Sequence, residues 1–111
     1  MNITIKGSGR LIPAVLVPDA ILALAYPYFT VEDAPDGGLW FELSPYVEVY
    51  DEDAVQTFLR NLTPYISSGT IECTLEIARD HVAKWTYMFT GSDCYRSHQT
   101  GSCMSYHCIN R

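Results

Sequence analysis

Between residues 53 and 62 apolar side chains recur with the period of an α-helix. Val55, Phe58, Leu59 and Leu62 stand at positions i, i+3, i+4 and i+7, which places them on one stripe of a helix. The residues between them are mostly polar. The pattern therefore predicts an amphipathic helix that buries one face.

The ends of this helix carry recognisable signals. Asp53 is expected as the N-cap, with Gln56 three residues further on as in a capping box. Asp51 and Glu52 add negative charge beside the positive end of the helix dipole. Pro64 disfavours helical geometry in the preceding residue, so the helix is expected to end there or one residue earlier.

The segments 70–78 and 82–89 alternate between apolar and polar residues, which is typical of strands with one buried face. A turn at 67–69 is expected to separate the helix from the first of them. The helix stripe is the natural cover for the apolar face of this pair. The residues predicted to point toward that core are Ile71, Cys73, Leu75, Ile77, Ala83, Trp85, Tyr87 and Phe89.

The N-terminal half predicts four further elements. Residues 1–11 and 28–32 read as strands, and Pro18–Tyr26 reads as a short helix that is apolar on nearly every side. Leu39–Tyr50 alternates without interruption and predicts a long strand. The Gly7-Ser8-Gly9 run predicts a bulge or bend rather than a phosphate-binding loop, because no phosphate-loop Lys-Ser/Thr follows it.

These elements predict an α+β fold: a mostly antiparallel sheet of four to five strands with two helices on one face. Their order resembles the ferredoxin-like arrangement, βαββαβ plus a final strand. Residues 1–90 are expected to form a single domain, and 91–111 a polar, Cys- and His-containing C-terminal tail.

The composition of the chain argues against some classes of function. A formal net charge of −6 argues against a basic nucleic-acid-binding surface, so we expect no direct binding of nucleic acid. The apolar run Leu11–Ala25 follows Lys6 and Arg10 in the outline of a signal peptide, but Pro13 and Pro18 interrupt it. We expect a buried helix there, no membrane segment, and a cytoplasmic protein.

Acidic residues concentrate between residues 32 and 53, where no Lys or Arg occurs. The predicted strand 39–50 places Trp40 and two tyrosines among carboxylates on its outward face, a mixture that favours a protein-binding patch. The alternative is that another strand or the tail covers Trp40. The candidate partner-binding residues are Glu32, Asp33, Asp36, Trp40, Glu42, Tyr46, Glu48, Tyr50, Asp51, Glu52 and Asp53.

The tail contains the residue types of a zinc site: Cys94, His98, Cys103 and Cys108, with His107 as an alternative last ligand. The tail is compatible with three interpretations: an ordinary polar tail, a zinc site, or a disulfide from Cys94 to Cys103 or Cys108. No other cofactor is indicated. No motif places a nucleophile beside its base, so no catalytic residue is assigned.

Two stretches carry a resemblance. IKGSGRLIP (Ile5–Pro13) and GTIECTLEIARDHVAKWTY (Gly69–Tyr87) resemble parts of an uncharacterised family of small bacterial and phage proteins. The shared motifs are structural, the Cys/His tail departs from them, and the family has no activity to carry over. In type, a short, acidic, single-domain chain is similar to small phage-encoded inhibitors, including anti-CRISPR proteins.

The sequence therefore favours a non-enzymatic interaction protein, an inhibitor whose acidic, aromatic face binds a protein with a basic nucleic-acid-binding cleft. If the protein is phage-encoded, its compartment would be the host cytoplasm. One alternative is a zinc-stabilised binding module that uses the tail, and another is a small enzyme with a Cys/His site. The oligomeric state is left open.

Overall fold

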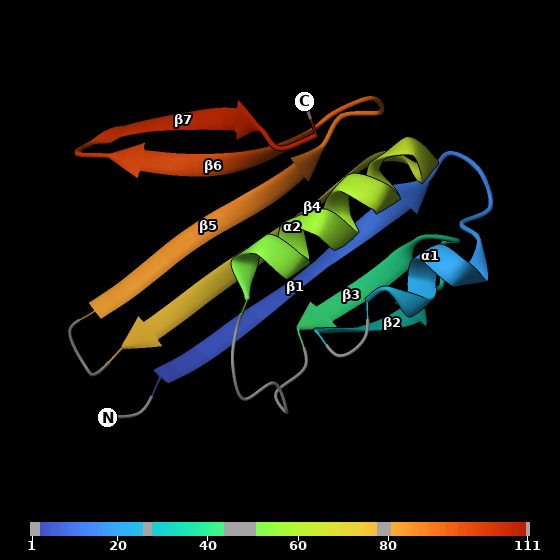
Figure 1. Ribbon diagram of the computed structural model, residues 1–111, viewed down its shortest axis with the longest axis horizontal. Helices are drawn as coiled ribbons and strands as arrows, with labels where there is room; N and C mark the ends of the chain where they lie inside the picture. Colours follow the sequence, from blue (N-terminus) through green and yellow to red (C-terminus); the bar gives the residue numbers. More distant parts are fainter. Residues whose placement is uncertain (1–2, 26–27, 44–50, 78–80, 111) are drawn as a thin grey trace.

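The computed structural model describes residues 3–25, 28–43, 51–77 and 81–110 of the chain (Figure 1). Its elements, in chain order, are β1 (Ile3–Pro13), α1 (Asp19–Ala23), β2 (Phe29–Asp33), β3 (Leu39–Leu43), α2 (Glu52–Leu62), the 3₁₀ turn η1 (Thr63–Tyr65), β4 (Ile66–Ile77), β5 (His81–Phe89), β6 (Cys94–Thr100) and β7 (Cys103–Cys108).

The strands form one seven-stranded sheet in the order β2-β3-β1-β4-β5-β6-β7, and every neighbouring pair is antiparallel. Figure 1 shows α2 lying along one face of this sheet, with the short α1 near β2 and β3. The longest pairing joins β1 to β4 and runs from Ile3 opposite Ile77 to Pro13 opposite Ile66. These two strands form the centre of the molecule.

The predicted four- to five-stranded sheet with ferredoxin-like order was wrong. The prediction placed one strand after residues 70–78, whereas here three strands, β5, β6 and β7, follow β4 and bring the sheet to seven. The two additional strands come from residues 94–108, the segment expected to be a polar tail. That segment has few apolar residues, and its strands are recognisable only through their pairing.

The apolar stripe of α2 covers the centre of the sheet as its period predicts. Val55, Phe58, Leu59 and Leu62 are all buried. The Phe58 ring lies 5.8 Å from that of Phe29 and 6.2 Å from that of Phe41, centroid to centroid. This core fixes the helix to one face of the sheet.

The start of α2 differs from its prediction by two residues. Asp51, not Asp53, is the N-cap, and its Oδ1 accepts a hydrogen bond from the Ala54 N–H (3.3 Å). Asp53 therefore lies in the first turn, where its charge still favours the helix dipole. The helix ends at Leu62, within the range that Pro64 predicts.

The expected turn at 67–69 does not exist, because these residues belong to β4. The chain turns earlier, in η1. Ser67 Oγ donates to the Ile12 carbonyl (2.9 Å), which ties the start of β4 to β1. The predicted bulge at Gly7–Gly9 is likewise absent, since pairing with β4 is regular there and shifts only between Ile12 and Pro13.

The segment before α1 is far more exposed than predicted. The helix covers only Asp19–Ala23 and has no fully buried residue, although Ile21 and Leu22 pack partly against the core. Leu16 is 92% exposed. Among the described residues no helix is long and apolar enough to cross a membrane.

Candidate interaction surface

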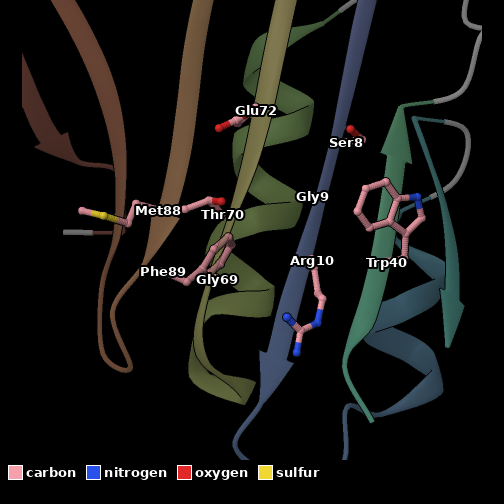
Figure 2. A pocket seen from close by; sticks show the side chains of 9 residues that line it. All are labelled: Ser8, Gly9, Arg10, Trp40, Gly69, Thr70, Glu72, Met88 and Phe89. Atoms are coloured by element: carbon pink, nitrogen blue, oxygen red, sulfur yellow. The ribbon is translucent and has the colours of Figure 1, made fainter. Parts of the chain in front are cut away.

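The sheet has two unlike faces. On the face under α2 the strands present the buried core residues, including Phe41, Ile71 and Tyr87. No described helix covers the opposite face, which we call the open face. Figure 2 looks onto it, with the Trp40 and Arg10 side chains in front of the sheet and α2 behind.

Strand register aligns the open-face residues in rows. Trp40 on β3 stands opposite Glu32 on β2 and opposite Arg10 on β1. Arg10 pairs in turn with Thr70 on β4, and Thr70 with Met88 on β5. One row of side chains thus crosses five strands.

The next row carries carboxylates. Ser8 on β1 lies between Glu42 on β3 and Glu72 on β4. Two strand spacings separate the two glutamates, or roughly 10 Å between backbones. The eight residues of these rows are hereafter the Trp40 surface: Glu32, Trp40, Arg10, Thr70, Met88, Glu42, Ser8 and Glu72.

Trp40 stands between two hollows. One, of about 520 Å³, is bordered by Trp40, Arg10, Thr70 and Met88 (Figure 2). The other, of about 500 Å³, lies between Trp40 and the β2–β3 turn. The indole is 37% exposed, so the reading in which another segment covers it does not hold among the described residues.

The β2–β3 turn holds Arg10 in place beside Trp40. Asp36 Oδ1 accepts from the Gly38 N–H (3.1 Å), and the other carboxylate oxygen forms an ion pair with Arg10. Both side chains of this pair remain about half exposed. The pair therefore positions groups around Trp40 more than it stabilises the fold.

Acidic and basic side chains of the open face lie at different positions along the strands. Glu32, Glu42 and Glu72 are exposed and form no ion pair with another described residue. Lys6 and Lys84 lie one row beyond Glu72, on either side of Thr74. The Trp40 end of the face is therefore acidic.

The acidic residues at the start of α2 lie on the other face of the sheet. Glu52 Oε1 accepts from Arg96 Nε (2.5 Å) and from the Tyr87 hydroxyl (3.1 Å). The Arg96 guanidinium also lies over the Trp85 ring, 5.3 Å from its centroid. Burial lowers the pKa of Arg96, but the Glu52 carboxylate and Tyr87 raise it more, so the net shift is upward.

The residues predicted as one acidic face are therefore divided by the fold. Glu32, Trp40 and Glu42 belong to the Trp40 surface, and Asp33 and Asp36 border the adjacent hollow. Asp51 is a helix cap, Glu52 joins α2 to β5 and β6, and Asp53 is an exposed first-turn residue. Tyr46, Glu48 and Tyr50 lie outside the described residues.

The sequence did not single out Arg10, Thr70, Glu72 or Met88 as members of a site. Their outward phase on alternating strands was the available signal, but it marks every open-face position equally. Only the register brings them beside Trp40.

The four candidate zinc ligands do not meet. Cys94 and Cys108 lie at one end of the β6–β7 hairpin, whereas Cys103 pairs with Thr100 at the other end. Cys108 lies five residue steps along the strand from Cys103, or about 17 Å, whereas zinc–sulfur bonds are about 2.3 Å long. No group of three metal-ligating side chains occurs among the residues that the structure describes.

All four cysteines are free thiols, and two are buried. Burial raises the pKa of Cys73 to about 12, with the Glu52 carboxylate adding to the rise and Arg96 opposing it. Burial also raises the pKa of Cys94 to about 12, and the neighbouring Cys108 adds to the rise. Neither thiol is poised to ionise near neutral pH, as a nucleophile would need.

No protein-family model matches the chain, and no curated protein or solved structure matches it either. The functional argument therefore depends on the geometry of the Trp40 surface.

Proposed function

We propose that the protein is a non-enzymatic interaction protein that binds a basic surface of a protein partner through the Trp40 surface. The observation that carries the proposal is the position of Trp40. It is exposed between two hollows, on a sheet face that no described helix covers.

Trp40 has the properties of an interface anchor. Tryptophan is enriched among the few residues that supply most of the binding energy in protein complexes. The strand under Trp40 is paired on both sides, with β2 and with β1, so its backbone is ordered before binding. Little conformational entropy is then lost when a partner packs against the indole.

The charges around the anchor suggest the chemistry of the partner. Glu32, Glu42 and Glu72 are not neutralised within the described chain, and the protein has a net charge of −6. Carboxylates on such a face steer basic partners toward it and can occupy positions that phosphates would otherwise take. We therefore infer a partner with a basic, nucleic-acid-binding cleft, as bound by inhibitors of the anti-CRISPR type.

The proposal is tested by comparing capture by the wild-type chain and by Trp40→Ala from a lysate of the cells in which the protein is naturally produced. Tyr106→Ala is the matched control, because Tyr106 is another exposed aromatic residue on the distant strand β7. A captured protein is then purified for titration. We expect Trp40→Ala to weaken its binding at least 30-fold, equivalent to about 2 kcal/mol.

Charge reversal provides the second arm. We expect Glu42→Lys combined with Glu72→Lys to weaken binding at least tenfold at low salt, and the difference to shrink as salt is added. Nucleic acid should compete with the protein for the partner. Binding that tolerates both substitutions, or that nucleic acid leaves unchanged, would refute the proposed function.

A further inference from the structure

The strands β5 and β6 pair over only part of their lengths. Their register covers Tyr87–Phe89 on β5 and Cys94–Arg96 on β6. Beyond that point β5 continues to His81 and β6 to Thr100, and both remain strands. Figure 1 shows the β6–β7 hairpin diverging from β5 in this region.

A side chain marks the end of the pairing. The Thr86 N–H donates to Ser97 Oγ (2.8 Å) instead of to a carbonyl of the neighbouring strand. Past this bond lies a hollow of about 460 Å³, bordered on one side by Lys84 and Trp85 and on the other by Ser97, His98 and Gln99. We call this hollow the β5–β6 cleft.

Strand alternation directs backbone groups that no neighbouring strand pairs with toward the cleft from both sides. The N–H groups of Thr86 and Thr90 point toward β6, so by the period of two that of Lys84 does as well. On β6, Cys94 bonds toward the C-terminal segment through its N–H and C=O, so Ser97 and Gln99 face β5. No described strand pairs with these groups in the cleft, and of the Ser97 groups only the carbonyl is engaged, since it accepts from Arg96 Nη1 (3.1 Å).

The side chains around the cleft are basic on a protein that is acidic. Lys84, Arg96 and His98 border it, and no carboxylate is among its bordering residues. Arg96 is engaged by Glu52 and closes the inner end, which leaves Lys84 and His98 to meet an incoming group. Exposed strand edges bind extended peptides through main-chain hydrogen bonds, and the side chains beside the edge set specificity.

We propose that the β5–β6 cleft binds an extended, acidic peptide segment of a partner protein by β-strand addition. The segment pairs with the backbone groups of Lys84, or with the Ser97 N–H and the backbone groups of Gln99, since the Ser97 carbonyl is held by Arg96. Its carboxylates lie on the open face of the sheet, against Lys84, which is in register with Thr74. The cleft lies away from Trp40, and binding there does not require the Trp40 surface.

The fluorescence of Trp85 can report whether a peptide occupies the β5–β6 cleft. A Trp40→Phe background leaves Trp85 as the only tryptophan, at the wall of the cleft. The probe is a capped eight-residue peptide that alternates Val or Thr with Glu, and a matched peptide carries Lys in place of each Glu. We expect saturable changes in Trp85 fluorescence with the Glu peptide, and at least tenfold weaker binding of the Lys peptide.

Two variants, each made in the Trp40→Phe background, test the charge and the edge separately. Lys84→Glu should weaken binding of the Glu peptide at least tenfold. The Gln99 N–H faces the cleft and not β7, so Gln99→Pro removes a donor for the peptide without breaking the pairing of β6 with β7. This variant should also weaken binding of the Glu peptide at least tenfold. Circular dichroism verifies that each variant is folded, and Tyr106→Ala in the same background should leave the affinity for the Glu peptide unchanged.

The proposal is wrong if the Glu peptide produces no saturable change, if the Lys peptide binds equally well, or if the folded Lys84→Glu and Gln99→Pro variants retain full affinity. It is also wrong if light scattering reveals a dimer that Gln99→Pro dissociates, because the cleft would then be occupied by a second copy of the chain.

Discussion

At the scale of single residues, two glycines set how closely the central strands approach. A Cβ on Gly9 would lie 2.0 Å from the Thr70 carbonyl oxygen and 2.5 Å from Ile71 Cα. Gly69 has a φ of +131°, a conformation that residues with a side chain rarely adopt. Within the Gly7-Ser8-Gly9 run, Gly9 is therefore the residue that close backbone packing requires.

Gly9→Ala should lower the free energy of unfolding by about 3 kcal/mol or more, because backbone atoms of β4 would have to move. Ser8→Ala is the control, since Ser8 points to the open face and its change should cost less than about 0.5 kcal/mol. Urea unfolding of the three proteins measures both effects. Equal midpoints for Gly9→Ala and the wild type would contradict the close approach.

Glu52 is the other decisive residue, because it is the acceptor that joins α2 to Arg96 and Tyr87. Glu52→Gln should lower the free energy of unfolding by about 2 kcal/mol, the usual contribution of charge-assisted hydrogen bonds. Asp53→Asn removes a neighbouring charge that contacts neither residue. Thermal unfolding should therefore separate the two variants, and a larger loss for Asp53→Asn would reject the assignment.

At the scale of elements, stability should decline outward from the centre of the sheet. β1 and β4 are paired on both sides, and the core beneath them is covered by α2. The β6–β7 hairpin is attached to β5 by a short pairing and to α2 by the Arg96–Glu52 ion pair, and the Ile109 carbonyl just after β7 accepts from Arg60 Nε (2.5 Å). Most of β7 is exposed.

Hydrogen exchange should therefore be slowest in the β1–β4 pair and fastest at the tip of the β6–β7 hairpin. We expect amides of Ile71 and Cys73 to exchange roughly 100-fold more slowly than those of His98 and Ser105, which pair within the hairpin, since local opening costs far less than global unfolding. Exchange followed by mass spectrometry or NMR measures this difference. Uniform protection across the sheet would show that the hairpin unfolds only with the core.

At the scale of the whole molecule, two buried thiols link stability to pH. Cys73 and Cys94 have folded-state pKa values raised from 9.0 to about 12. Above pH 9 the unfolded chain releases these protons, while the folded chain keeps them. The stabilisation from the raised pKa values is therefore complete below pH 9 and is lost as pH rises toward 12.

Cys73→Ala should reduce the slope of unfolding free energy against pH between 9 and 12 by about 1.4 kcal/mol per pH unit. Cys103→Ala is the matched control, because Cys103 is exposed and its substitution should leave the slope unchanged. Urea titrations at intervals across this range measure both slopes. Parallel curves for the wild type and Cys73→Ala would contradict the role of the buried thiol.

Much of the fold could be predicted from periodicity. The helical stripe of α2 and the alternating strands β4 and β5 occupy nearly their expected positions, because each has a continuous apolar face that must be buried. The strands β6 and β7 could not be predicted in the same way. Cys94, Tyr95 and Arg96 show no clean alternation, and their strand forms because β5 offers an edge.

The candidate site, too, could be predicted only where a local pattern marks its residues. The sequence by itself determined that Trp40 and the carboxylates beside it face away from the core, because an alternating strand must bury Phe41 and Leu43. Tertiary structure alone decided which residues from other strands join them. The register placed Arg10, Thr70 and Glu72 beside Trp40, and the position of α2 placed Asp51, Glu52 and Asp53 on the opposite side of the sheet. Neither outcome could be predicted, because pairing between strands that are distant in sequence leaves no local pattern.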